Sequence, residues 1–185
     1  MRIIAGDFKG KKILQPKDKL TRPLKDLTKE SIFNIINHSN LININIKKSN
    51  ILDLFAGVGS FGLECISRGS LSVTFFENYT KVIKILKLNI ESMNIQKKIK
   101  IIERNLFEDK SLNLLNQKFE IIFIDPPFKE EKLNFLLKKI QKLKLLSKNG
   151  IIIIHRHKNQ NDIFPKGYKV IIEKFYGISK IIFLN

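Results

Sequence analysis

The chain has 185 residues, 43% of them apolar and 28% charged, which is typical of one globular domain and excludes a disordered or fibrous protein. Lys and Arg total 34 against 17 Asp and Glu, and this formal charge of +17 favours a polyanionic partner such as nucleic acid, although A/T-rich codons on a solvated surface also explain part of the excess. The single Cys65 excludes an internal disulfide and a cysteine-based zinc site; because we find neither a signal peptide nor an apolar run that could span a bilayer, we expect a cytoplasmic protein without membrane contact.

The first 20 residues predict a basic β-hairpin arm. Two short runs, 2–5 and 11–15, flank a turn in which Gly10 is free to adopt a positive φ. The arm and the segment after it carry many cations and few acids, so we expect RNA contacts there. The side chains predicted to contact RNA are Arg2, Lys9, Lys11, Lys12, Arg22 and Lys29.

The next segment, "LKDLTKESIFNIINHS", predicts an amphipathic helix. Its expected apolar stripe consists of Leu24, Leu27, Ile32, Ile35 and Ile36.

From Asn50 onward, apolar runs typical of buried strands alternate with amphipathic stretches typical of helices. The predicted parallel strands are 51–55, 72–76, 100–103, 120–124 and 151–154. Two further β-rich runs, on either side of Gly177, predict an antiparallel pair. We therefore expect an α/β fold with a mostly parallel seven-stranded sheet, a C-terminal antiparallel hairpin and the N-terminal arm, with the ligand at the carboxyl ends of the strands.

The loop "GVGSFG", residues 57–62, follows a predicted strand and opens a predicted helix, as in nucleotide-binding α/β proteins. Asp53 stands in the strand ahead of Gly57 and Gly59. A dinucleotide brings two negative phosphates to such a loop, which an unpaired carboxylate opposes. S-adenosylmethionine brings an ammonium and a sulfonium, which the carboxylate favours, so we predict this cofactor.

Two further polar residues stand at strand ends. Glu77 closes the second strand, at the offset where an acid accepts hydrogen bonds from ribose hydroxyls; a solvated acid is the alternative. Asn105 follows the third strand, where its amide could read an adenine amino group; a plain turn residue explains it equally well.

The segment "DPPF", residues 125–128, follows the fourth strand. Two successive prolines keep the backbone extended and present carbonyl oxygens without competing N–H donors. Asp125 adds a carboxylate and Phe128 an aromatic face, a combination suited to a planar base with an exocyclic amine.

Together, "DLFAGVGSFGLE" and "DPPF" resemble the class I S-adenosylmethionine-dependent methyltransferases of exocyclic amines, which have a Rossmann-like fold. "MRIIAGDFKGKKI" and "TRPLKDLTKESIFNII" narrow the resemblance to the bacterial 16S ribosomal RNA guanine-N2 methyltransferase family, RsmD, and the similarity continues to the closing "EKFYGISKIIFLN". The resemblance implies an arm over residues 1–20 and a methyltransferase domain over residues 21–185.

The family also implies roles for individual residues. The implied cofactor contacts are Asp53, Phe55, Ala56, Gly57, Gly59, Glu77, Asn78, Asn105 and Leu106. The implied catalytic, base-binding residues are Asp125, Pro126, Pro127 and Phe128. The implied substrate is small-subunit rRNA with ribosomal proteins already bound, in a subunit or an assembly intermediate, and we expect a monomeric enzyme.

The chain departs from the family pattern at two places. Relatives usually have arginines near Leu27 and Lys29, which makes the first helix here a weaker candidate for gripping phosphates. Relatives also tend to have an acid where this chain has His155-Arg156-His157. Histidines two apart on a strand face the same side, but no third ligand is evident and methyl transfer needs no metal, so we predict no metal site.

We interpret the reaction as direct displacement of the cofactor's methyl group by the N2 amine of a guanine, with Asp125 accepting hydrogen bonds from the base. An adenine-N6 methyltransferase of DNA or RNA is the nearest alternative, because such enzymes also use Asp before two prolines. A nicotinamide-dependent oxidoreductase, favoured by the glycine pattern, and a non-catalytic RNA-binding protein are the alternatives from other classes.

Overall fold

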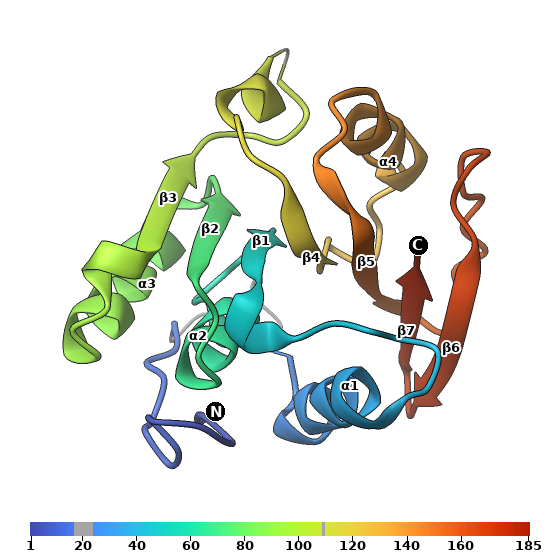
Figure 1. Ribbon diagram of the computed structural model, residues 1–185. Coiled ribbons are helices and arrows are strands. Elements are labelled where there is room, and N and C mark those ends of the chain that lie inside the picture. The colour runs from blue at the N-terminus through green and yellow to red at the C-terminus, as the bar shows by residue number, and fades with distance from the viewer. Residues whose placement is uncertain (17–23, 109) are drawn as a thin grey trace.

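A seven-stranded mixed sheet organises the computed structural model, which describes residues 1–16, 24–108 and 110–185. The strand order is β3-β2-β1-β4-β5-β7-β6, and it can be followed across Figure 1 from β3 to β6. Strands β3, β2, β1, β4 and β5 are parallel, whereas β7 runs antiparallel to both β5 and β6. The predicted fold class, a mostly parallel seven-stranded sheet with a C-terminal antiparallel hairpin, is therefore confirmed.

The strands are β1 Asn50–Leu54, β2 Ser72–Glu77, β3 Ile99–Glu103, β4 Phe119–Ile124, β5 Leu146–His157, β6 Val170–Tyr176 and β7 Ser179–Leu184. The helices are α1 Asp26–His38, α2 Ser60–Ser67, α3 Thr80–Ser92 and α4 Leu133–Lys142, with short 3-10 turns at Ile46–Lys48, Gln96–Lys98 and Ser111–Leu114. In the described ranges, no helix combines the length and the apolar character needed to cross a bilayer.

Helices cover both faces of the sheet, because alternate residues of each buried strand point to opposite sides. On one face, Ile51 and Phe123 belong to a core shared with α1, α2 and α3. On the other face, Leu52 and Ile122 belong to a second core, to which α4 contributes Leu136. Both faces are buried, so polar side chains of the central strands are left mainly at the strand ends.

Strand β5 is longer than predicted. The sequence indicates only residues 151–154, but the strand continues through His155, Arg156 and His157. These polar residues remain in the sheet because β7 pairs with them, in a register that opposes Arg156 to Lys180. The extension carries three polar side chains past the end of β4, towards the segment that follows it.

The apolar stripe predicted for the first helix is confirmed at Leu24, Ile32 and Ile36, which are buried. The exception is Leu27, which is 70% exposed, whereas the charged Lys29 is completely buried. The Lys29 ammonium lies 3.5 Å from the Glu64 carboxylate in α2 and donates to the Arg2 carbonyl oxygen at 2.8 Å. Burial lowers the pKa of Lys29, and the nearby Glu64 carboxylate partly opposes that shift. Lys29 is thus buried on this helix beside a buried carboxylate.

In the part of the predicted N-terminal hairpin arm that is described, residues 1–16, the chain turns back on itself with one isolated antiparallel bridge between Arg2 and Lys12, and residues 17–20 of the predicted arm lie outside the described residues. The described part packs on α2 rather than projecting from the molecule, as Figure 1 shows. The buried Glu64 carboxylate accepts hydrogen bonds from the backbone N–H groups of Ile4 at 2.7 Å and Ala5 at 3.0 Å. The hairpin thus shares the core and the polar contacts of the sheet domain.

Candidate active site

Three acidic residues meet at the carboxyl edge of the parallel strands. Asp53 lies in β1, Glu77 ends β2, and Asp125 directly follows β4, its N–H donating to the Leu54 carbonyl at 3.3 Å. The Gly57 N–H donates to Glu77 Oε2 at 2.8 Å, which joins the glycine loop to the end of β2. The strand ends predicted to converge do so, because parallel strands β2, β1 and β4 are direct neighbours.

Each glycine of the loop meets a different steric requirement. Gly57 has φ +56°, and a Cβ there would meet no atom of the described residues within 4 Å. Gly59 has φ +84° and immediately precedes α2. At Gly62, a Cβ would lie 2.4 Å from the Phe75 ring of β2. Gly62 therefore allows the helix to pack closely on the sheet, while Gly57 leaves open space beside the backbone.

Asp53 is buried beneath this loop. Asp53 is 1% exposed, and its Oδ2 accepts a hydrogen bond from the Gly62 N–H at 3.0 Å. Burial raises the pKa of Asp53 well above its usual range, and the nearby Asp125 and Glu77 carboxylates raise it further, against the effect of the Gly62 hydrogen bond. A cationic ligand at this edge would relieve that cluster of negative charge.

Glu77 is already engaged by the backbone. Besides the Gly57 N–H, its carboxylate accepts from the N–H groups of Asn78 at 2.8 Å and Tyr79 at 2.9 Å. A carboxylate has about four acceptor positions, so one remains for a ligand hydroxyl. Asn78 itself is exposed.

The remaining residues predicted to contact a cofactor closely follow strands β1 and β3. Phe55 has an unusual positive φ of +59°, and its ring centroid lies 6.0 Å from that of Phe107. Ala56 and Leu106 are buried. Asn105 Oδ1 accepts from the Phe107 N–H at 2.9 Å, so this oxygen stabilises a turn, as the simpler interpretation of Asn105 expects.

The Asp125-Pro126-Pro127-Phe128 segment is held by side chains that sequence reasoning did not assign. Asp125 Oδ1 lies 2.8 Å from His155 Nδ1. The Arg156 guanidinium donates to the Pro127 carbonyl at 3.4 Å and, on the neighbouring loop, to the Glu130 carbonyl at 2.9 Å, while Gln160 donates to the Phe128 carbonyl at 2.7 Å. Pro126 is buried and Pro127 exposed.

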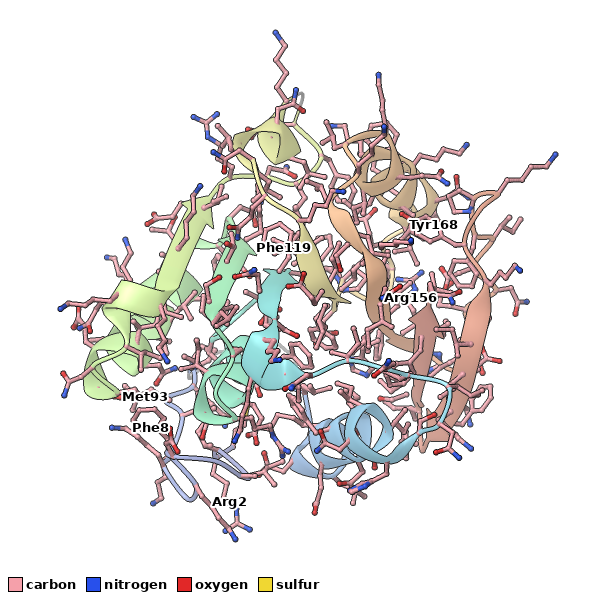
Figure 2. The ribbon with its side chains drawn as sticks, viewed as in Figure 1. Arg2, Phe8, Met93, Phe119, Arg156 and Tyr168 are labelled. Atoms are coloured by element: carbon pink, nitrogen blue, oxygen red, sulfur yellow. The ribbon has the colours of Figure 1, made fainter. Side chains whose placement is uncertain are left out.

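The end of β5 thus accounts for the sequence His155-Arg156-His157. Arg156 is 2% exposed and also pairs with Asp162 at 3.0 Å; Figure 2 labels it beside β5. The Phe128 ring makes edge contacts with the rings of His155 and His157, at centroid distances of 5.7 and 5.3 Å. The signal in the sequence was the run of three polar residues directly after an apolar strand.

The basic residues predicted to contact RNA differ in their exposure to solvent. Arg2, Lys9 and Lys12 are exposed on the hairpin, and Figure 2 shows Arg2 at the edge of the molecule. Lys11 donates to the Ser92 carbonyl of α3. The prediction for Lys29 is wrong, because a buried ammonium paired with a carboxylate cannot reach a surface phosphate.

Arg22 lies outside the described residues. Among the described residues, no cluster of three or more His, Cys, Asp or Glu side chains could hold a metal.

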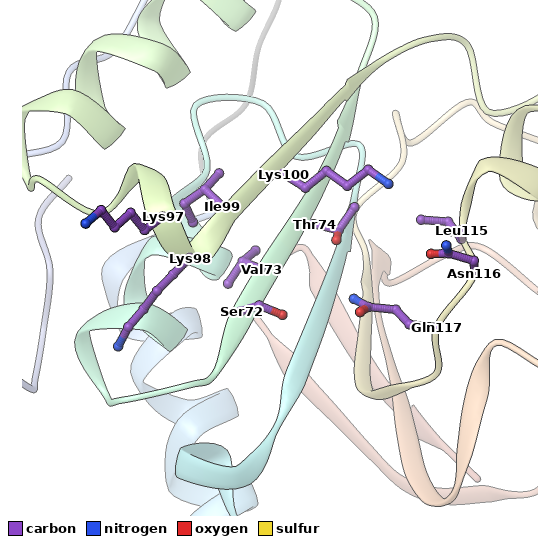
Figure 3. Close-up of a pocket in the computed structure, with 10 residues that line it drawn as sticks. All are labelled: Ser72, Val73, Thr74, Lys97, Lys98, Ile99, Lys100, Leu115, Asn116 and Gln117. Atoms are coloured by element: carbon purple, nitrogen blue, oxygen red, sulfur yellow. The ribbon is translucent and has the colours of Figure 1, made fainter.

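A cavity of about 200 Å³ lies at the other end of the sheet (Figure 3). It is lined by the first residues of β2 and β3, including Ser72 and Lys100, and by Lys97 and Lys98. The glycine loop and Asp125 follow the carboxyl ends of the strands, so this cavity is not part of the candidate site.

Comparison with known proteins agrees with this geometry. The family described as "Conserved hypothetical protein 95" matches residues 1–185. "Ribosomal RNA small subunit methyltransferase D" of Buchnera aphidicola subsp. Acyrthosiphon pisum is 33% identical over 172 residues, which cover 93% of this chain and 86% of that protein.

Two solved structures share the whole fold. One from Haemophilus influenzae, provisionally assigned as a methylase, is 29% identical with a TM-score of 0.75 and covers 99% of this chain and 96% of its own. One from Escherichia coli, provisionally assigned as a methyltransferase, has a TM-score of 0.80 at 23% identity and covers 100% of this chain and 96% of its own.

Proposed function

The chain belongs to the ribosomal RNA small subunit methyltransferase D family, and we propose that it transfers a methyl group from S-adenosylmethionine to the N2 amine of a guanine in small-subunit rRNA. The observation that carries the proposal is the juxtaposition of two features at one sheet edge. These are the open glycine loop at Gly57 and the proline-stiffened Asp125 segment, whose strands β1 and β4 are adjacent.

The residues around the loop fit S-adenosylmethionine. Among the described residues, no atom lies within 4 Å of the Cβ position at Gly57, which allows a ligand to approach the backbone, and the hydrogen bonds of Glu77 to these residues leave an acceptor position for a ribose hydroxyl. The carboxyl groups of Asp53, Glu77 and Asp125 form an acidic cluster in which Asp53 is buried and the other two are partly exposed, and this cluster suits a cationic cofactor and disfavours the two phosphates of a dinucleotide. When bound, the cofactor supplies a methyl carbon that already carries a good leaving group.

Asp125 is the residue that we assign to the substrate amine. Guanine presents N1–H and N2–H as adjacent donors, and an ionised carboxylate is a pure acceptor. Hydrogen bonds from the amine to Asp125 and to a carbonyl of the proline segment favour a localised nitrogen lone pair. Arg156 and Gln160 donate hydrogen bonds that hold this segment in place before the substrate binds. The entropy cost of orienting the reacting groups is therefore lower during methyl transfer.

The basic surface fits an rRNA substrate. Exposed Arg2, Lys9 and Lys12 lie on one hairpin of a chain with a formal charge of +17. We assign the substrate as rRNA within a small ribosomal subunit or an assembly intermediate, and the enzyme as a cytoplasmic monomer. Family membership supports the substrate assignment, since the similar Buchnera protein is named for the small-subunit rRNA.

The test supplies labelled cofactor with unmodified small subunits, naked 16S rRNA or DNA, and identifies the labelled nucleoside by mass spectrometry. We expect N2-methylguanine from the subunits. Asp125→Ala should abolish transfer while leaving the Kd for adenosylhomocysteine within about threefold, and Glu91→Ala, an exposed carboxylate on α3, should keep full activity. Label in N6-methyladenine, or unchanged transfer by Asp125→Ala, contradicts the proposal.

A further inference from the structure

A buried chain of three side chains connects the proposed catalytic carboxylate to β7. Asp125 Oδ1 lies 2.8 Å from His155 Nδ1, and His155 Nε2 lies 2.8 Å from Ser179 Oγ. The side chains of His155 and Asp125 are 10% and 19% exposed, and Ser179 is buried. Both ring nitrogens of His155 are therefore hydrogen-bonded, Nδ1 to Asp125 at the candidate site and Nε2 to Ser179 in the interior of the sheet.

The sheet register creates this chain. Ile124 of β4 is opposite Ile154 of β5, so the residues that follow them, Asp125 and His155, come to lie side by side. Ser179 starts β7, which pairs antiparallel with the end of β5. All three positions depend on backbone pairing, so the contact belongs to the rigid part of the fold.

The hydrogen-bond partners determine the tautomer of His155. An ionised carboxylate has no proton to donate, so Nδ1 of the imidazole must donate to Asp125. In the neutral ring, Nε2 is then the acceptor and takes the Ser179 hydroxyl proton. Among the described residues, the Asp125 carboxylate is held through Oδ1, and we assign its second oxygen to the substrate amine.

We propose that His155 is a positioning residue for methyl transfer, which holds the Asp125 carboxylate through the Asp125–His155–Ser179 chain and supports the reaction in its neutral form. This inference rests on the proposed function. In the step, the amine nitrogen bonds to the methyl carbon while the carbon–sulfur bond breaks and its electron pair goes to sulfur. The surplus proton on nitrogen then goes to Asp125 or to water.

Protonation of His155 opposes this step. An imidazolium 2.8 Å from Asp125 draws the carboxylate into an ion pair and places positive charge beside a nitrogen that is itself becoming positive. Ser179 accommodates both forms, because its hydroxyl accepts a hydrogen bond as readily as it donates one. The chain therefore links the rate of transfer to a side chain of the type that ordinarily changes charge near neutral pH.

Several other charged or titratable groups of the described residues lie on the elements around His155. They are Asp53, Asp125, Lys129, Glu130, Arg156, His157, Asp162, Glu173, Lys174, Tyr176 and Lys180, of which Lys174 and Tyr176 lie on the face of β6 that adjoins Ser179. Arg156 and Lys180 alternate with His155 and Ser179 along their strands, so they face the other side of the sheet, towards Asp162 and Glu173. His157 contacts the Phe128 ring, and Asp53 interacts electrostatically with Asp125.

The experiment measures single-turnover methyl transfer to unmodified small subunits between about pH 5.5 and pH 8.5, the range in which histidines ordinarily titrate. His155→Asn keeps an N–H donor near the Nδ1 position but cannot be protonated. We expect the wild-type rate to fall towards acidic pH and the His155→Asn rate to lose that fall. His155→Leu should lose about 10- to 100-fold against the wild type at the alkaline end of this range, since a misoriented catalytic group costs that much, and should also lack the acidic fall, with the adenosylhomocysteine Kd unchanged.

Two controls accompany these variants. His38→Asn removes an exposed histidine of α1 and should keep the wild-type rate and pH profile, and His157→Asn should keep the acidic fall. If the His155 variants fail to fold, Ser179→Ala keeps the imidazole and removes only its Nε2 partner. We expect a loss of about 2- to 10-fold for that neutral hydrogen bond.

The possible outcomes separate this inference from the proposed function. A wild-type profile in His155→Asn, a wild-type rate in His155→Leu, or a wild-type rate in Ser179→Ala overturns the role of His155 and leaves the methyltransferase assignment standing. A wild-type chain that binds adenosylhomocysteine but methylates no small subunit overturns both.

Discussion

Gly57 in the glycine loop and Gly62 in the first turn of α2 allow ligand binding to be separated from packing. Replacing Gly57 by alanine places a methyl group in space where no atom of the described residues lies within 4 Å, at φ +56°. Replacing Gly62 by alanine places the methyl 2.4 Å from Phe75 Cε1 and 2.7 Å from Val73 Cγ1. The first substitution fills the proposed cofactor space, and the second wedges α2 away from the sheet.

The two substitutions should cost similar amounts of stability. At Gly57, a left-handed conformation costs an alanine about 1–2 kcal/mol. At Gly62, overpacking costs about 1–3 kcal/mol, and the better helix propensity of alanine offsets about 1 kcal/mol of it. For a chain of this length, each 1 kcal/mol lowers Tm by roughly 2–4 °C. Comparable Tm values therefore make the pair a matched comparison.

Calorimetric titration with adenosylhomocysteine distinguishes the two variants. We expect Gly57→Ala to raise its Kd about tenfold or more, because a methyl group in a close ligand contact costs at least about 1.4 kcal/mol. Gly62→Ala should stay within about threefold of the wild-type Kd. Normal affinity in Gly57→Ala, or a selective loss in Gly62→Ala, would refute the assignment of the open space to the cofactor.

Three further predictions concern charge. The folded-state pKa of Asp53 is raised, so its contribution to the free energy of unfolding is complete below the ordinary carboxyl range and is lost as pH rises through the raised pKa. Urea unfolding at several pH values should therefore show a free energy of unfolding that falls with pH in the wild type and falls less in Asp53→Asn. Substituting both Lys9 and Lys12 by alanine should raise the Kd for rRNA and reduce the salt slope by about 0.7–0.9 per lysine, whereas Lys138→Ala on α4 should change neither. Glu64→Ala should cost about 3–5 kcal/mol in chemical denaturation, because it removes the buried carboxylate that pairs with the buried Lys29 ammonium and leaves the more distant, partly exposed Asp26; a cost under 1 kcal/mol would contradict the buried ion pair.

The positions of Asp53, Glu77 and Asp125 were predictable because they depend on few assumptions. Apolar runs separated by helices imply a parallel sheet, and the carboxyl ends of parallel strands share an edge. Any acid directly after such a strand must then lie at that edge, whatever the exact pairing. The glycine pattern was informative for the same reason, because it marks a local backbone shape next to one strand.

The burial of Lys29 was not predictable by the same means. Periodicity assigns Leu27 to the core face of α1 because it counts apolar residues, and it has no knowledge of partners far along the chain. The partner is Glu64, which is 35 positions later and itself fully buried. A buried charged lysine is stable only when it is paired with a carboxylate, and this pair forms only after α1 and α2 have packed together.

The proximity of His155 to Asp125, on which its proposed role depends, was predictable in part, because it follows from the register between two predicted strands. Strands β4 and β5 pair in parallel with a constant offset of 30 residues from Ile121↔Ile151 to Ile124↔Ile154, so the offset extended by one residue sets Asp125 beside His155. The sequence shows both strands and both polar residues, but the register that joins them depends on the packing of the whole sheet. His155 continues an apolar strand next to the proposed catalytic carboxylate, so we interpret it as a partner of that carboxylate, and its contribution can be measured through the pH dependence of the proposed reaction.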